Sequence, residues 1–345
     1  MRISKLREKI KEVDGFIVTN LNNIHYLVGF SGSSGVLIIT QKEVVFFTDF
    51  RYKEQCAREI KSADVVIVKE SLFDEISRHS IVRSLKKIGF EESIKYSSYS
   101  ILKKELKGKK LSPLKNKVEE LRKIKEPGEI KIIKESAKIA LSSFEAIKSL
   151  IKVGIREMDI ALELEYRMKK NGAQGTSFET IVGSGPNAAL PHARAGRRKL
   201  KSGDTVVLDF GVLYYYYSSD TTRTIILGEN PEAHKVYKIV EKAQLAAIKE
   251  IKPGVALKEL DHIARDIISN AGYGKYFGHS LGHGVGLEVH ELPRLSTKSE
   301  DIAAPGMVFT VEPGIYIPNS CGVRIEDMVV VRDKGIDIIT KTSNV

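Results

Sequence analysis

Hydrophobic patterning divides the chain into two parts with different predicted arrangements of helices and strands. The first part opens with an amphipathic stripe over residues 1–13, which predicts a helix. Short runs rich in β-branched and aromatic residues follow, separated by stretches with helical spacing. The predicted strands are 16–19, 36–40, 44–48 and 65–68, and the helical stretches are 52–61 and 71–87. This alternation predicts a small α/β domain over residues 1–120.

The second part, residues 121–345, is predicted to be a separate α+β domain. A charged segment bracketed by Pro113 and Pro127 marks the boundary, and Pro127 stands where a first helical turn would begin. Apolar residues then recur at helical spacing over about six turns. A second helix is expected over residues 157–170, where Asn171-Gly172 follows, because glycine commonly terminates helices.

This second part contains an internal repeat with an offset of 100 residues. Residues 152–155 and 252–255 have similar sequences, and each segment precedes a helical pattern that ends at a glycine. Another helical pattern precedes each segment, and an apolar hairpin pattern with two acids follows each helix pair. We therefore predict two related αα-ββ halves that face each other about a pseudo-twofold axis.

Four acidic residues interrupt these apolar hairpin segments. They are Asp209 and Asp220 in the first half and Glu312 and Glu326 in the second. The midpoints of the two pairs fall at residues 214–215 and at Asn319, so hairpins folded there would place each pair side by side. A buried carboxylate is costly unless it is paired or binds a metal ion. The four acids therefore predict a metal site to which each half contributes one pair.

Histidines gather in a glycine-rich segment, residues 278–291, between the two hairpins. They are His279, His283 and His290, and His192 precedes the first hairpin. A single histidine is more often a surface or core residue, but this cluster beside buried acids favours metal or proton chemistry. Arg324 lies two residues before Glu326 and so shares its strand face, which makes it a candidate partner of the site. Ile325 and Asp327 are expected to face away.

Two aspartates, two glutamates and one histidine form a hard, oxygen-rich ligand set. The four carboxylates carry a formal charge of −4, which two divalent cations would cancel. Such a ligand set suits Mn, Co, Zn or Fe better than Cu or a thiolate-bound structural zinc. Two ions that share a hydroxide would direct it at a carbonyl carbon, which predicts metal-assisted hydrolysis.

Composition narrows the class of protein further. The chain is 42% hydrophobic and 29% charged, and it contains neither an apolar run that could span a membrane nor a signal-peptide core. Its two cysteines, Cys56 and Cys321, lie far apart in sequence, which argues against a disulfide framework and favours the reducing cytoplasm. Much of the net charge of +11 falls within residues 101–134, which hold no aromatic residue. We therefore expect a solvated surface there instead of a nucleic-acid site.

Five motifs resemble those of the pita-bread metallopeptidases, which include aminopeptidase P, prolidase and methionine aminopeptidase. They are Val-Leu-Asp-Phe-Gly at 207–211, Ser-Asp-Thr-Thr-Arg-Thr at 219–224, Gly-His-Gly-Val-Gly-Leu-Glu-Val-His-Glu at 282–291, Val-Glu-Pro-Gly-Ile-Tyr at 311–316 and Val-Arg-Ile-Glu-Asp at 323–327. The N-terminal part, with Tyr-Leu-Val-Gly-Phe at 26–30 and Thr-Asp-Phe-Arg-Tyr at 48–52, looks like the creatinase-type domain of aminopeptidase P and prolidase. Methionine aminopeptidases lack that domain.

The resemblance implies roles for individual residues. The family's metal ligands fall on Asp209, Asp220, His283, Glu312 and Glu326. Its substrate-positioning and proton-handling residues fall on His192, His279, His290 and Arg324. In the family Glu312 would also act as the general base, and His290 would contact the scissile carbonyl.

The implied reaction is hydrolysis of an N-terminal Xaa-Pro peptide bond by a hydroxide that bridges two metal ions. We favour aminopeptidase P, which acts on longer peptides, because the sequences at 30–35 and 48–52 look more like it. Prolidase, which cleaves Xaa-Pro dipeptides, is the alternative. A catalytically inactive peptide- or nucleic-acid-associated binding protein is a third reading, which the complete ligand set disfavours. The resemblance also implies a homodimer.

Overall fold

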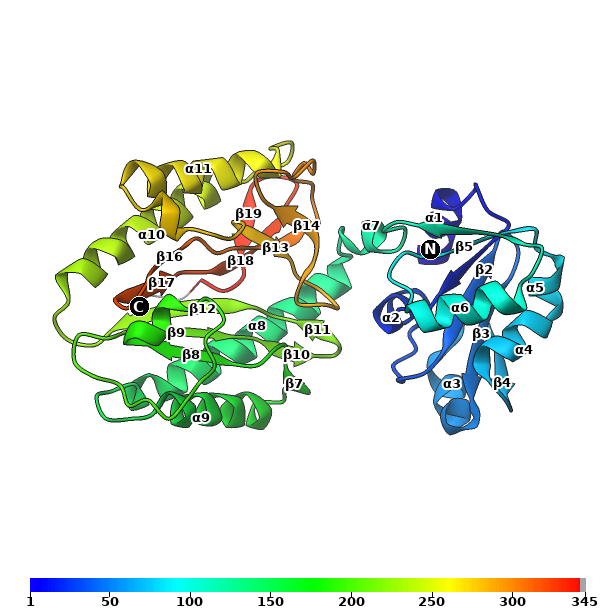
Figure 1. The fold of residues 1–345 in the computed structure, drawn as a ribbon, viewed down its shortest axis with the longest axis horizontal. Helices are drawn as coiled ribbons and strands as arrows, with labels where there is room; N and C mark the ends of the chain where they lie inside the picture. The colour runs from blue at the N-terminus through cyan, green and yellow to red at the C-terminus, as the bar shows by residue number, and fades with distance from the viewer. Residues whose placement is uncertain (342–345) are drawn as a thin grey trace. The chain divides into compact units, whose positions relative to one another are not determined.

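The computed structural model describes residues 1–341, which form two compact units (Figure 1). The first unit spans Met1–Arg122 and the second begins at Lys123. None of the helices among the described residues has the length and apolar character that a membrane crossing requires.

The first unit is built on one mixed sheet of six strands, in the order β4-β3-β2-β1-β5-β6. Its strands are β1 (Gly15–Val18), β2 (Val36–Thr40), β3 (Val44–Asp49), β4 (Asp64–Val68), β5 (Lys87–Glu91) and β6 (Lys110–Leu114). Its helices are α1 (Arg2–Lys9), α2 (Leu21–Val28), α3 (Lys53–Glu59), α4 (Leu72–Arg78), α5 (Ser80–Ser84), α6 (Tyr96–Glu105) and α7 (Glu119–Arg122). The central strand β1 pairs antiparallel with β2 and parallel with β5, so the predicted α/β character is confirmed.

Two local predictions for this unit differ from the structure. The helix expected over residues 71–87 is two shorter helices, because His79 takes an extended backbone conformation between α4 and α5. Helix α2 is not among the elements predicted from the sequence. It forms because the Asn20 side chain accepts hydrogen bonds from the Asn22 and Asn23 amides at the helix start.

The second unit contains four long helices and several small sheets. The helices are α8 (Pro127–Ile147), α9 (Glu157–Lys170), α10 (Pro231–Glu250) and α11 (Leu257–Asn270). The strands of its first half are β7 (Gly175–Thr176), β8 (Ile181–Ser184), β9 (Thr205–Phe210), β10 (Val212–Tyr214), β11 (Tyr217–Ser218) and β12 (Thr221–Ile226). Those of its second half are β13 (Gly282–Gly284), β14 (Glu291–Leu295), β15 (Val308–Val311), β16 (Gly314–Ile317), β17 (Cys321–Arg324), β18 (Asp327–Val331) and β19 (Ile336–Ile338). Figure 1 shows α8 and α9 on one side of these strands and α10 and α11 on the other.

The internal repeat is visible in the backbone. Helices α9 and α11 begin and end 100 residues apart, at Glu157–Lys170 and Leu257–Asn270. Gly154 and Gly254, just before the two helices, have positive φ angles of 94° and 91°. In each half the helices cover an apolar core, which contains Phe144 and Phe210 in one half and Leu260 and Phe309 in the other. The predicted pair of αα-ββ halves is therefore confirmed.

Candidate metal centre

The first hairpin brings Asp209 and Asp220 to one end of strands β9 and β12. The residue that pairs with Asp209 is Thr222, so the two aspartates are diagonal neighbours. The expected midpoint at residues 214–215 is therefore wrong by one residue. The turn instead consists of Tyr215 and Tyr216, which both have positive φ angles, of 44° and 67°. A two-residue turn of this kind suits the twist of a hairpin, although such φ angles are unusual for tyrosine.

The second hairpin has the register that the sequence predicts. Strands β16 and β17 pair Ile317 with Cys321, which centres the turn on Asn319 at a φ of 60°. The neighbouring strands β15 and β18 pair Val311 with Asp327 in the same register. Glu312 and Glu326 lie between these two sets of pairs and so stand opposite each other, as expected.

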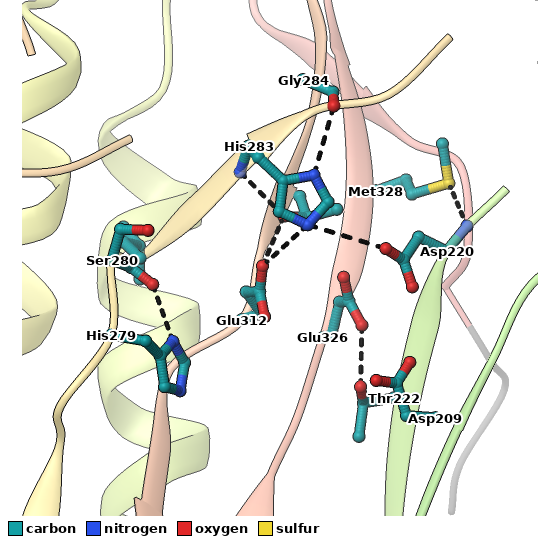
Figure 2. A network of polar contacts seen from close by, with 12 residues as sticks. Asp209, Asp220, Thr222, His279, Ser280, His283, Gly284, Glu312, Glu326 and Met328 are labelled. Carbon is teal, nitrogen blue, oxygen red and sulfur yellow. Dashed lines mark hydrogen bonds and ion pairs between the residues drawn. The ribbon is translucent and has the colours of Figure 1, made fainter. Parts of the chain in front are cut away.

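The five predicted ligands converge on one site (Figure 2). Three groups of residues each have ligand atoms within 4.8 Å of one another: Asp220 with His283 and His290, His283 with Glu312 and Glu326, and Asp209 with Asp220 and Glu326. The His283 Nε2 atom lies 3.1 Å from Glu312 Oε1 and 3.6 Å from Asp220 Oδ2. The two hairpins and strand β13 therefore present their donor atoms to a common space.

Burial strongly affects the ionisation of these groups. It raises the pKa of Asp220 and of Glu326 well above the ordinary values, and the neighbouring carboxylates raise both further. Burial is the largest single influence on the pKa of Glu312 and acts to raise it. The hydrogen bond from His283 and the charges of His283, His279 and Arg324 together outweigh burial and lower that pKa to about 2. It is therefore costly for all of these carboxylates to be ionised together unless cations are bound among them.

Two buried carboxylate oxygens in the site lack a partner. Within residues 1–341, Asp209 Oδ1 and Glu326 Oε1 are both buried and accept no hydrogen bond. Such orphaned acceptors are costly in a protein interior. Their position among hard oxygen donors and one imidazole fits divalent cations, which would supply the missing positive charge.

Comparison with known proteins agrees with this chemistry. Residues 131–333 match metallopeptidase family M24, and residues 2–124 match the creatinase/prolidase N-terminal domain. The chain belongs to metallopeptidase family M24. It is 39% identical to the Xaa-Pro dipeptidase of Pyrococcus horikoshii, over 98% of each chain.

Solved M24-type structures have the same fold. The structure of an Xaa-Pro dipeptidase from Bacillus anthracis aligns with a TM-score of 0.96 and 43% identity, covering 100% of this chain and 98% of the other. That of an X-Pro aminopeptidase from Thermotoga maritima aligns with a TM-score of 0.89 and 37% identity, covering 98% of both chains. Proteins named Xaa-Pro dipeptidase and X-Pro aminopeptidase therefore share this architecture.

The predicted histidines occupy different places around the M24 centre. The His290 side chain is only partly covered, and its ring centroid lies 4.2 Å from that of His283. Burial and the neighbouring His283 lower the pKa of His290. His192 is exposed and forms no hydrogen bond within the part of the chain that the structure describes, although its charge also acts on His290. The preceding carbonyl, of Pro191, accepts a hydrogen bond from Arg324.

A hydrogen-bonded chain joins His279 to the carboxylates. His279 Nε2 lies 3.0 Å from the Tyr316 hydroxyl, which accepts a hydrogen bond of 2.9 Å from Arg324 Nη1. Arg324 Nη2 in turn donates to Asp209 Oδ2 at 2.6 Å. As predicted, Arg324 faces the site, whereas Asp327 faces away and binds Arg223.

Sequence reasoning missed three polar residues that bind the candidate ligands or the side chains beside them. Tyr316 is buried beside Arg324. Thr222 donates to Glu326 Oε2 at 2.8 Å, and Thr310 donates to Glu312 Oε1 at 3.1 Å. Strand periodicity could have found the threonines, because each lies two residues from an acid in sequence and so shares its strand face.

Proposed function

We propose that the chain is an Xaa-Pro dipeptidase, a prolidase that depends on two divalent metal ions. The names of relatives that match nearly the whole chain support this reading over aminopeptidase P, which the N-terminal motifs had favoured. The shared fold alone does not separate the two activities, since an X-Pro aminopeptidase also has it. The distinction has to come from a group that recognises the second residue of a dipeptide.

The position of Arg294 beside the centre is the observation that supports the proposal. It lies on β14 directly opposite His283, so the two side chains share one face of the sheet. Arg294 is exposed, its charge contributes to the lowered pKa of His290, and no carboxylate among residues 1–341 pairs with it. A free guanidinium beside the centre can bind a carboxylate through two parallel hydrogen bonds. A dipeptide places its terminal carboxylate one residue from the cleaved bond, whereas a longer peptide does not.

In this proposal the five clustered ligands would hold the two ions, Mn or Co in the first place and Zn or Fe as alternatives. When bound, such ions lower the pKa of water and polarise a carbonyl group. Glu312, whose pKa of about 2 keeps it ionised, accepts the proton of the attacking water. His290, which its lowered pKa keeps neutral, donates a ring N–H to the scissile carbonyl. The proton then passes to the proline nitrogen, which leaves as a secondary amine.

Two further properties belong to the proposal. A cytoplasmic location is supported by Cys56 and Cys321, which are both buried and unpaired. A homodimer is implied by the resemblance, and size-exclusion chromatography with light scattering would test it. Nucleic acid is not a partner in this proposal, because the candidate centre is a cluster of carboxylates and histidines that does not suit phosphate groups.

The test compares Gly-Pro, Gly-Pro-amide and Gly-Pro-Pro as substrates of chelated protein that is re-loaded with Mn²⁺ or Co²⁺. We expect Gly-Pro to be preferred, and the Arg294→Gln variant to raise its KM by about 10-fold to 100-fold, since a charge-assisted hydrogen bond contributes about 1.5–3 kcal/mol. The KM for the amide should change little. Equal cleavage of the tripeptide with no effect of Arg294→Gln would indicate aminopeptidase P. No hydrolysis and no bound metal would indicate a binding protein.

A further inference from the structure

Helix α11 carries a charged pair that the metal centre does not use. Asp261 is fully buried, and Arg265 lies one turn further along the helix. The guanidinium binds both carboxylate oxygens, with Nε 2.8 Å from Oδ2 and Nη2 3.0 Å from Oδ1. Ion pairs of this spacing are usually exposed and contribute little to stability. Burying a carboxylate is costly, so Asp261 is expected to have a role besides pairing with Arg265.

The pair binds the backbone of residues 277–281, which lie outside any helix or strand. Arg265 Nη1 donates to the Phe277 carbonyl at 3.0 Å, and Arg265 Nη2 donates to the His279 carbonyl at 2.8 Å. Asp261 Oδ1 accepts a hydrogen bond of 3.0 Å from the Leu281 amide. The two side chains thus bind the backbone at every second residue, at positions 277, 279 and 281. These positions include His279 and flank it on both sides.

This segment leads directly into the metal centre. The Leu281 carbonyl accepts a 2.8 Å hydrogen bond from the amide of Glu312. The His279 ring reaches the hydroxyl of Tyr316, the first link of the chain to Arg324. A shift of residues 277–281 would therefore move both an imidazole and the backbone of a ligand.

We propose that Asp261 and Arg265 are positioning residues that hold His279 within hydrogen-bond reach of Tyr316. This positioning role rests on the proposed dipeptidase function only for the tests that measure activity. Gly278 lies inside the segment and has wide conformational freedom, so backbone order there depends on outside contacts. The planar guanidinium supplies four hydrogen bonds at fixed angles, two to Asp261 and two to carbonyls. A lysine keeps the charge but lacks this fork.

The experiment uses Arg265→Lys and Arg265→Gln in the full chain, with Arg167→Gln as the matched control. Arg167 forms an i,i+4 pair with Glu163 on α9, the corresponding helix of the other half. Among residues 1–341 its side chain forms no other ion pair, and it does not bind the centre. The first readout is the NMR signal of the His279 ring, assigned with His279→Ala. The second readout is kcat for Gly-Pro, measured with the content of bound metal. Both are measured in the single variants and in the double variant Arg265→Gln/His279→Ala.

We expect the His279 ring signals to shift in both Arg265 variants and to stay in place in the control. Arg265→Gln should lower kcat by about 10-fold or more with unchanged metal content, because misplacement of a catalytic group by 1 Å can cost up to about 10²-fold. In the His279→Ala background, Arg265→Gln should cause no further decrease in kcat. Unshifted ring signals in both variants, or an equal loss of kcat in that background, would overturn the proposal. If the wild-type chain hydrolyses no dipeptide, the proposed function fails and the ring signals alone decide this one.

Discussion

Glu326→Gln should stabilise the metal-free protein, although it removes a predicted ligand. Glu326 is buried and shares a site with Asp209 and Asp220, all with ligand atoms within 4.8 Å of one another. The glutamine oxygen can still accept the 2.8 Å hydrogen bond from Thr222. Its amide group can donate to the neighbouring carboxylates, one oxygen of which has no partner in the described structure. The substitution therefore removes charge repulsion without removing packing.

The size of the gain follows from Coulomb's law. Two unit charges at about 4.8 Å in an effective dielectric of about 20 repel each other by about 3.5 kcal/mol. Protonation and water relieve part of this, so we expect the variant to gain about 2 kcal/mol in free energy of unfolding at pH 8. In a unit of this size that gain raises the unfolding temperature by about 4–8 °C.

The dependence on pH has a definite sign. The pKa of Glu326 in the folded protein lies well above its ordinary value of 4.5, mainly through burial. The folded state then binds the proton more tightly than the unfolded state, so wild-type stability falls as pH rises through the window above 4.5. Glutamine does not titrate. The stability difference between variant and wild type should therefore widen from pH 5 to pH 8 and close at lower pH.

Calorimetry of chelated protein, with and without added Mn²⁺, measures these differences. Added Mn²⁺ should reverse the order, because the wild type binds the ion more tightly and gains more stability from it. Asp327→Asn is the control, since that carboxylate accepts hydrogen bonds from Arg223, Gln244 and Thr340. It should lower stability by about 1–3 kcal/mol. A chelated Glu326→Gln protein that unfolds at or below the wild-type temperature at pH 8 would refute the reasoning.

Three further predictions concern the centre and its first hairpin. Glu312→Ala should reduce Gly-Pro hydrolysis to the level of chelated enzyme with an unchanged circular dichroism spectrum, and retained activity would contradict the mechanism. Tyr316→Phe removes the hydroxyl that accepts the Arg324 hydrogen bond. It should lower kcat by about 10-fold, as expected for a misplaced proton-handling group, while KM changes little. Tyr215→Asn with Tyr216→Gly should raise stability in urea by about 1–2 kcal/mol, because both residues have positive φ. No gain would mean that the turn is unstrained.

The elements with strong periodicity could be predicted from the sequence. Helix α9 has the bounds that its apolar spacing and the following Asn171-Gly172 indicate. The turn at Asn319 was placed correctly because Pro318 and Gly322 flank it and the acids on both sides are equidistant. In the first hairpin, four consecutive tyrosines at 214–217 give no such signal, and the register was misplaced by one residue.

Contacts between segments far apart in sequence could not be predicted. The hydroxyl of Tyr316 meets His279 and Arg324 only after β16, β17 and the loop at 277–281 have packed together. Asp261 and Arg265 have the spacing of an ordinary surface pair on a helix, and nothing in their sequence indicates that they bind a loop 12 to 20 residues further on. Such roles depend on tertiary structure, which local patterns do not encode.

The division of the candidate ligands between two halves means that a bound ion would cross-link those halves. Asp209 and Asp220 belong to the first half, whereas His283, Glu312 and Glu326 belong to the second. A chain cut at the exposed Glu229, between β12 and α10, would leave two donors on one fragment and three on the other. Each fragment alone would be a poor chelator, and added cation would favour their reassociation. With the proposed ligand set, high-affinity metal uptake by a growing polypeptide would have to wait until residue 326 has been synthesised and both halves have docked.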